Sequence, residues 1–83
     1  MPVIKFGATW CSPCKQLDHI IESIGYSDKI EKIDVDADPD KAKGFGIRSI
    51  PTLIKTDSEG NELGRRTGSC SKEQFLEFYG NDQ

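Results

Sequence analysis

Several kinds of residue are scarce in this chain of 83 residues, and each scarcity excludes a class of protein. The three cysteines are too few, and odd in number, for the disulfide framework of a small secreted domain. Acidic residues outnumber basic ones by 14 to 11, the formal net charge is −3, and no basic patch stands out, so we expect no nucleic-acid partner. No apolar run approaches the roughly 18 residues of a membrane span, so we expect no membrane association.

The length and composition of the chain favour one small folded unit. A single domain over residues 1–83 is expected, since 35% hydrophobic and 30% charged residues fit a folded chain better than a disordered one. The beginning of the sequence shows no signal-peptide pattern, and we expect a cytoplasmic monomer. In a reducing compartment, two closely spaced cysteines are more often catalytic or metal-binding than structural.

The chemistry of the chain is concentrated in the stretch Trp10-Cys11-Ser12-Pro13-Cys14-Lys15. Its two cysteines follow a short apolar run and precede a helical pattern. At a helix start, unpaired backbone N–H groups and the positive end of the helix dipole stabilise a thiolate. The spacing brings the second sulfur within one turn of the first, so that it can attack a mixed disulfide formed there. The pattern predicts a dithiol–disulfide oxidoreductase.

The first part of the chain predicts a strand followed by a helix. Val3–Phe6 is apolar enough for a central strand, although Lys5 interrupts it. Pro13 suits the first turn of a helix, and Gly25 is a natural residue to end it. The apolar positions of this helix are Cys14, Leu17, Ile20, Ile21 and Ile24, and its other face carries Lys15, Gln16, Asp18, Glu22 and Ser23.

A second strand and a short helix are predicted next. Alternating apolar residues place the strand over about residues 30–35. Asp38 is an N-cap residue followed by Pro39 at the first helical position, and Gly44 stops the helix that they open.

A hairpin and a last helix complete the pattern. Residues 51–56 and 61–66 predict two strands, and the turn-forming residues between them fold the second strand back antiparallel to the first. Ser71 and Gln74 form a capping-box pattern ahead of the last helix. The apolar stripe of that helix is expected from Phe75, Leu76 and Tyr79, and Gly80 ends it.

This order of elements, β-α-β-α-β-β-α, predicts an α/β fold. The first strand–helix–strand unit should be right-handed and parallel and the hairpin antiparallel, which gives a mixed four-stranded sheet flanked by helices. The two cysteines follow the C-terminal end of the first strand, where open α/β sheets usually place their ligands.

Three features resemble the thioredoxin family: the motif Trp10–Lys15, the segment Gly46-Ile47-Arg48-Ser49-Ile50-Pro51-Thr52, and Gly68 after the last strand. The resemblance covers nearly the whole chain and implies a thioredoxin-like fold that lacks the N-terminal strand and helix of full thioredoxins. It implies that Cys11 is the attacking thiolate, that Cys14 is the buried resolving thiol, and that Pro51 has a cis peptide bond.

The resemblance also implies a substrate surface and an electron source. In the family, the backbone beside the cis-proline pairs with an extended substrate segment. The substrate-binding residues implied here are Trp10, Ser12, Pro13, Ile50, Pro51 and Gly68. Disulfide-containing proteins are the implied targets, no cofactor or metal is bound, and electrons come from NADPH through a thioredoxin reductase-like flavoprotein, or from glutathione.

Two positions depart from the family pattern. Ser12 replaces the usual glycine in the dipeptide that tunes the reduction potential. Lys5 stands, by its distance from Cys11, where thioredoxins carry a buried aspartate that assists proton transfer at the second cysteine. An ammonium near the sulfurs favours the thiolate. Since Lys32 matches a neighbouring lysine of the family, Lys5 and Lys32 are both candidates for tuning the thiol pKa.

Alternative interpretations stay open. The two cysteines also fit a structural role as small buried side chains. They also fit a zinc site, for which only Cys70 and His19 remain as further ligands. Cys70 itself fits either a small residue at a helix start or a third redox-active thiol. A glutaredoxin-type, glutathione-dependent enzyme suits the chain length but not the Trp-Cys-Ser-Pro-Cys pattern, and it would carry a double glycine after the last strand. A non-enzymatic binding module with a thioredoxin-like surface is the third function considered.

Overall fold

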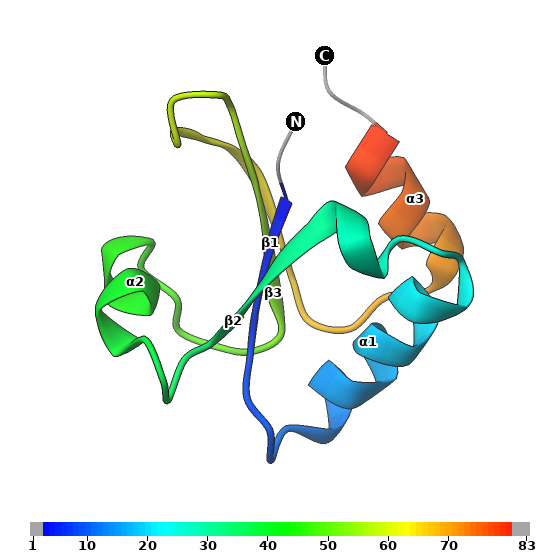
Figure 1. The fold of residues 1–83 in the computed structure, drawn as a ribbon, viewed down its shortest axis with the longest axis horizontal. Coiled ribbons are helices and arrows are strands. Elements are labelled where there is room, and N and C mark those ends of the chain that lie inside the picture. Colours follow the sequence, from blue (N-terminus) through cyan, green and yellow to red (C-terminus); the bar gives the residue numbers. More distant parts are fainter. Residues whose placement is uncertain (1–2, 81–83) are drawn as a thin grey trace.

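The computed structural model describes residues 3–80 and arranges them as a four-stranded sheet with helices on both faces (Figure 1). The strands are β1 (Val3–Gly7), β2 (Ile30–Asp34), β3 (Thr52–Thr56) and β4 (Glu62–Thr67). The helices are α1 (Ser12–Ser23), the short 3₁₀ helix η1 (Ser27–Lys29), α2 (Pro39–Gly44) and α3 (Lys72–Gly80). The expected domain range, 1–83, includes residues 1–2 and 81–83, which lie outside the described part of the chain.

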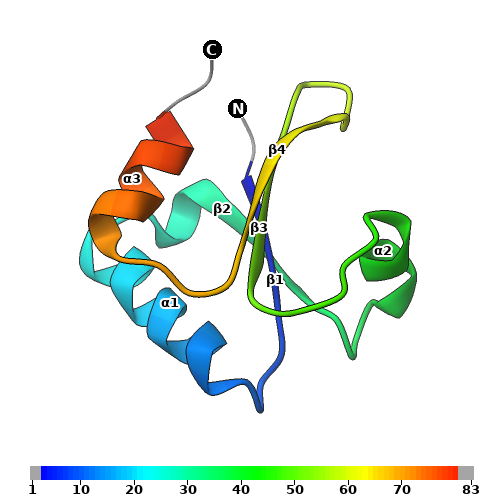
Figure 2. The same ribbon diagram turned by 180° about the vertical axis from the view of Figure 1, so that it is seen from behind.

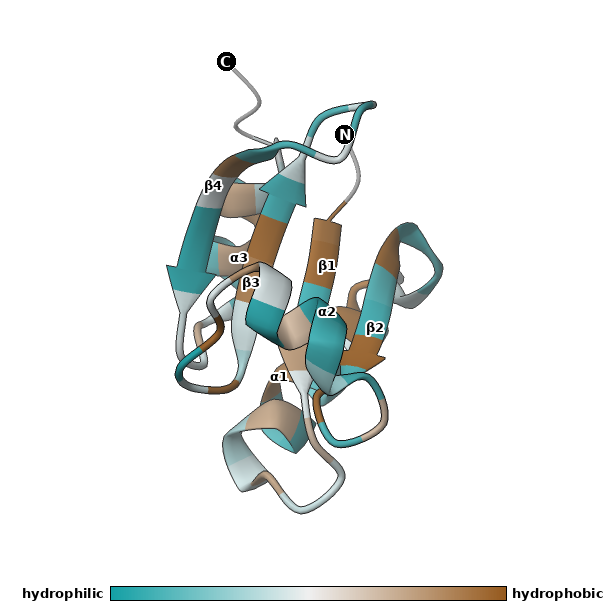
Figure 3. Ribbon diagram, turned by 90° about the vertical axis from the view of Figure 1, so that its left-hand side faces the viewer, coloured by the Kyte–Doolittle hydropathy of each residue, from teal (hydrophilic) through white to brown (hydrophobic). Residues whose placement is uncertain are grey.

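The sheet has the strand order β2-β1-β3-β4. β1 runs parallel to β2 and antiparallel to β3, and β3 runs antiparallel to β4. The predicted mixed four-stranded sheet is therefore confirmed. Every residue of β1 and β3 is buried, whereas β2 and β4 are partly exposed edge strands. In Figure 3, which is coloured by hydropathy, β1 is apolar apart from a hydrophilic band in its middle, and β4 is mostly hydrophilic.

Two apolar clusters cover the two faces of the sheet, because successive side chains of a strand point to opposite faces. α1 and α3 lie on one face and α2 lies on the other (Figures 1 and 2). The α1/α3 face is built around Val3, Leu17, Ile21, Leu53, Cys70 and Phe75. The α2 face is built around Ile4, Phe6, Ala42 and Ile54. By the same alternation, Lys5 and Gly7 of β1 belong to the α1 side.

The helix boundaries follow the predicted capping residues. The Asp38 carboxylate accepts a hydrogen bond from the backbone N–H of Lys41 at 3.2 Å. Ser71 and Gln74 exchange hydrogen bonds of 2.9 and 3.1 Å between side chain and backbone, so the predicted capping box is confirmed. None of the helices within residues 3–80 is both long and apolar enough to cross a bilayer.

One detail of the sequence prediction is wrong. Leu76 is not part of the apolar stripe of α3: it is 38% exposed, and Phe78 packs against the core in its place, together with Phe75 and Tyr79. The reason is the helical repeat, since positions i, i+3 and i+4 share a face while i+1 is turned away from it. The turn η1 was not predicted. The observed strand bounds lie within one residue of the predicted ranges, which were about 30–35, 51–56 and about 61–66.

Candidate active site

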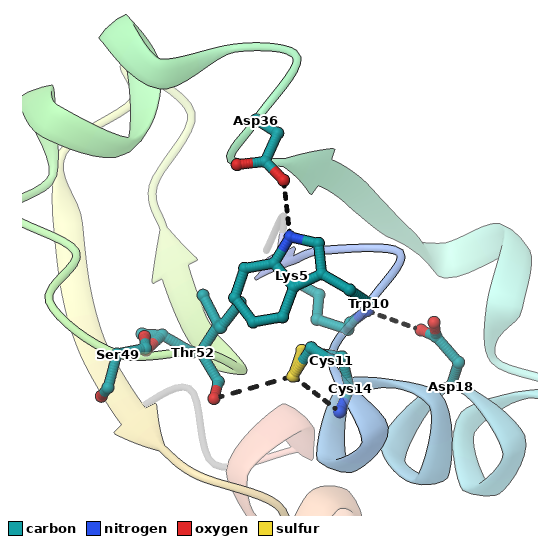
Figure 4. The surroundings of a disulfide bond; sticks show 9 residues. Lys5, Trp10, Cys11, Cys14, Asp18, Asp36, Ser49 and Thr52 are labelled. Atoms are coloured by element: carbon teal, nitrogen blue, oxygen red, sulfur yellow. Dashed lines mark hydrogen bonds and ion pairs between the residues drawn. A yellow bond between two sulfur atoms is a disulfide. The ribbon is translucent and has the colours of Figure 1, made fainter.

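The two cysteines lie where β1 gives way to α1, and they form a disulfide (Figure 4). Cys11 is the N-cap residue of α1 and Cys14 lies in its first turn. The backbone N–H of Cys14 donates to the Cys11 sulfur at 3.3 Å. This N–H is one of the first-turn donors that have no partner inside the helix. It is therefore placed to stabilise a Cys11 thiolate once the disulfide is reduced.

The two sulfur-bearing residues differ in depth. Cys11 is 5% exposed and Cys14 is 1% exposed. The Cys11 sulfur also lies 3.9 Å from the carbonyl oxygen of Ile50, on the segment that leads into β3. Cys11 is thus the more exposed cysteine and lies next to a second chain segment, and Cys14 is more deeply buried in the first turn of α1.

That second segment is fixed by its own hydrogen bonds. The Ile50–Pro51 peptide bond is cis. The carbonyl oxygen of Pro51 accepts a hydrogen bond of 2.8 Å from the N–H of Gly68, and the Thr52 hydroxyl donates to the carbonyl of Ser49 at 2.7 Å. Gly68 has a φ of 91°, a conformation that favours glycine. Ile50, Pro51 and Gly68, singled out in the sequence, are thereby joined next to Cys11.

Trp10 forms an exposed wall of the site. Its side chain is 66% exposed, and its indole N–H donates a hydrogen bond of 2.7 Å to the Asp36 carboxylate (Figure 4). Ser12 and Pro13, between the cysteines, are also exposed. The role of Asp36 was not predicted from the sequence. The parallel pairing of β1 and β2 contained the clue, because residues that follow parallel strands meet at one edge of the sheet.

Lys5 is buried on the inner side of the site. It is 4% exposed, and its ammonium lies 2.8 Å from a carboxylate oxygen of Asp18 on α1. The sequence pattern places Asp18 on the polar face of its helix and does not predict this ion pair. Lys32 is exposed, and its ammonium donates to the Ser27 hydroxyl at 3.1 Å. Lys5, Asp18 and Lys32 line a common pocket of about 240 Å³.

His19 and Cys70, the remaining candidates for a metal ligand, differ in burial and in environment. His19 is exposed on α1, whereas Cys70 is 7% exposed and packs in the α1/α3 core. Cys70 is a free thiol. Within residues 3–80, no three His, Cys, Asp or Glu side chains are grouped as a metal site would require.

Comparisons with known proteins agree with this geometry. Residues 1–80 match the family model for thioredoxin. A thioredoxin from Chlamydia muridarum is 36% identical over 84 residues, an alignment that covers 98% of this chain and 81% of the relative. A thioredoxin from Buchnera aphidicola is 38% identical over 80 residues, covering 92% of this chain and 73% of the relative.

Solved structures give the same result. The germline-specific thioredoxin Deadhead of Drosophila melanogaster superposes with a TM-score of 0.84 at 28% identity, covering 99% of this chain and 80% of that one. A mutant thioredoxin of Halobacterium salinarum superposes with a TM-score of 0.79 at 26% identity, covering 93% of this chain and 69% of that one. With a Cys11–Cys14 pair at the start of α1 as its redox centre, this chain belongs to the thioredoxin family and is a thiol–disulfide oxidoreductase.

Proposed function

We propose that this oxidoreductase is a reductant of protein disulfides, with Cys11 as the attacking thiolate and Cys14 as the resolving thiol. The observation that carries the proposal is the placement of the cysteine pair. Cys11 is the outer residue, it caps a helix, and it lies between the exposed Trp10 and the Ile50–Pro51 segment. A folded protein can reach such a surface, and a thiolate is stabilised there by the helix start.

The reaction consists of two exchanges. The Cys11 thiolate attacks one sulfur of the target disulfide, forms a mixed disulfide, and releases the other target sulfur as a thiolate that takes up a proton from water. The Cys14 thiol loses its proton to solvent and its sulfur attacks Cys11. The Cys11–Cys14 bond forms, the bond to the target breaks, and the target leaves with both its sulfurs reduced. The chain has then lost two electrons to the target.

The target is expected to bind along the surface around Cys11. Trp10, Ser12 and Pro13 offer exposed contacts on one side of the sulfur, and Ile50, Pro51 and Gly68 lie on the other. An extended substrate segment that pairs with the backbone at Ile50 would bring its own sulfur in line with Cys11, which is a strand-addition mode of recognition. The 3.9 Å separation between the Ile50 carbonyl and the Cys11 sulfur supports this arrangement.

The electron donor is proposed to be a flavoprotein of the thioredoxin reductase kind that draws electrons from NADPH. We further propose that the chain acts in the cytoplasm as a monomer and binds no cofactor of its own. Two observations support this: the relatives described above are thioredoxins, and the redox chemistry needs only the two cysteines. Glutathione is the competing electron source.

Reduction of insulin disulfides tests the proposal. The wild-type chain is supplied either with NADPH and thioredoxin reductase, or with NADPH, glutathione and glutathione reductase. Turnover with the first system alone is expected. Turnover with glutathione alone would overturn the donor assignment, and failure with both systems and with dithiothreitol would overturn the reductase proposal.

Two variants assign the cysteine roles. Cys14→Ser should accumulate a mixed disulfide with insulin through Cys11, whereas Cys11→Ser should form none. Cys70→Ala is the matched control, because it removes the third thiol and should leave turnover intact. Trapping of the target by Cys14 in the Cys11→Ser variant would reverse the two roles.

A further inference from the structure

Lys5 is a charged residue in the buried interior of the sheet. It lies in the middle of a strand whose five residues are all buried, and it points to the α1 side together with Val3 and Gly7. Burying an unpaired ammonium is costly. Here the ammonium is paired with Asp18, whose contacting oxygen is itself shielded from solvent, at 2.8 Å. The side chains are 5% and 36% exposed, so the carboxylate connects the buried charge to the surface.

The ammonium of Lys5 lies close to the sulfur of Cys14. A Cβ atom added to Gly7 would meet the Lys5 nitrogen at 3.0 Å and the Cys14 sulfur at 3.2 Å. Because both atoms lie beside the same point, they fall within the roughly 6 Å over which a charge acts strongly on an ionisable neighbour. Glycine at position 7 leaves the space between them free of a side chain. Figure 4 shows the Lys5 side chain passing behind Trp10, above the cysteines in this view, toward Asp18.

Four other charged residues line the same pocket as Lys5. Lys15 and Asp18 come from α1, and Lys32 and Asp34 come from β2. Lys15 and Lys32 are exposed, so water screens their charges, and the Lys32 ammonium is held by Ser27. From β3, Leu53 is paired with Lys5 and carries no charge, and the Lys55 ammonium lies over the Phe78 ring. Lys5 is therefore a buried positive charge that lies close to the Cys14 sulfur.

We infer that Lys5 and Asp18 are positioning residues for the second exchange: the Lys5 ammonium stabilises the Cys14 thiolate, and Asp18 holds the ammonium and moderates its effect. When the Cys14 proton leaves for solvent, the negative charge that remains on sulfur faces a fixed positive charge. The thiolate then attacks Cys11 with the bond changes given above. This inference rests on the proposed two-step exchange. In the second exchange, the charge on the Cys14 sulfur is then controlled by a buried cation, Lys5, and a partly exposed anion, Asp18.

The direct test is a pH titration of Cys14 in the reduced chain, followed by the ¹³Cβ chemical shift of that residue. In Lys5→Met the midpoint of the Cys14 titration should rise by about 1–3 pH units, because an opposite charge is lost. In Asp18→Asn it should fall, because the ammonium then acts without its counter-charge. Lys15→Met, which removes an exposed lysine at the same pocket, is the matched control and should shift the midpoint much less.

A kinetic measurement checks the same point in the reaction. A mixed disulfide between Cys11 and a small aromatic thiol is prepared, and the release of the thiol by Cys14 is followed at neutral pH. In Lys5→Met the release should slow about threefold for each pH unit by which the titration rises, since the tenfold loss of thiolate is partly offset by its greater nucleophilicity. Asp18→Asn should not slow it.

The outcomes are distinct. Opposite shifts in the two single variants support the inference. An unchanged or lower midpoint in Lys5→Met, or equal upward shifts in both variants, would show that the ion pair only maintains structure and would overturn it. If a single variant fails to fold, the double variant Lys5→Met/Asp18→Asn leaves no unpaired buried charge and should show the raised midpoint. None of these measurements uses a target protein or a reductase, so a failed insulin assay does not affect them.

Discussion

The indole N–H of Trp10 donates a hydrogen bond of 2.7 Å to the carboxylate of Asp36, across the loops that follow β1 and β2. The ring is 66% exposed, so this bond is what holds a large apolar surface in one place beside Cys11. Asp36→Ala should therefore slow the reduction of insulin by about 2–10-fold, the effect of one lost hydrogen bond. Reduction of a small aromatic disulfide, which needs no docking surface, should change little.

Two further variants make this prediction specific. Asp36→Asn keeps an acceptor oxygen and should retain most of the insulin activity. Asp40→Asn removes the same charge from an exposed residue of α2 and should leave the rate unchanged. Equal losses in Asp36→Ala and Asp40→Asn would mean that net charge matters and the hydrogen bond does not.

Gly7 leaves little room for a side chain. A Cβ atom there would lie 3.0 Å from the Lys5 nitrogen and 3.2 Å from the Cys14 sulfur, which is closer than side chains normally pack. Gly7→Ala should lower the free energy of unfolding by about 1–3 kcal/mol, the usual cost of overpacking. Gly64→Ala is the control, because its Cβ would meet nothing within 4 Å and it also lies in a strand. Urea unfolding of the oxidised proteins measures both, and equal stability of the two variants would contradict the prediction.

The sequence predicted the elements and the redox centre because those depend on local patterns. We predicted β1, α1, α2 and the capping box of α3 from hydrophobic alternation, from the positions of proline and glycine, and from capping residues. The redox chemistry was predicted from the spacing of the two cysteines at a helix start. The partners of Trp10 and Lys5 were not predicted. Asp36 and Asp18 lie 26 and 13 positions away along the chain, and only the packing of β2 and α1 against β1 brings them together.

The free energy of unfolding should depend on pH in part through the ionisation of the Glu62 carboxyl group. A hydrogen bond from Arg65, and then its charge, hold the pKa of Glu62 below its ordinary value of 4.5. Arg65 also donates a hydrogen bond of 2.6 Å to the Phe45 carbonyl. The Glu62–Arg65 ion pair thereby connects β4 to the chain segment after α2. A lowered folded-state pKa means that the contribution is present above the unfolded pKa of about 4.5 and is lost as the pH falls through the folded value.

Glu62→Gln isolates this contribution. The exposed ion pair is worth at most about 1 kcal/mol, so the wild type and the variant should differ by that amount near neutral pH and converge in acid. Glu77→Gln removes the same charge from an exposed position of α3 and is the control. Urea unfolding at several pH values measures the difference, and a gap between wild type and Glu62→Gln that stays constant into acid would contradict the assignment.

Two adjacent residues of α3, Phe75 and Leu76, are predicted to contribute very differently to the free energy of unfolding. Phe75 is fully buried and packs against Tyr26 and Tyr79, with ring centroids 5.7 and 5.9 Å away, whereas Leu76 is 38% exposed. Phe75→Ala should cost about 3–5 kcal/mol of unfolding free energy, enough to leave little of the stability of so small a domain. Leu76→Ala should stay within about 0.5 kcal/mol of wild type. The sequence pattern treats both as members of one stripe and predicts similar losses, so comparable losses in urea unfolding would favour that pattern over the packing seen in α3.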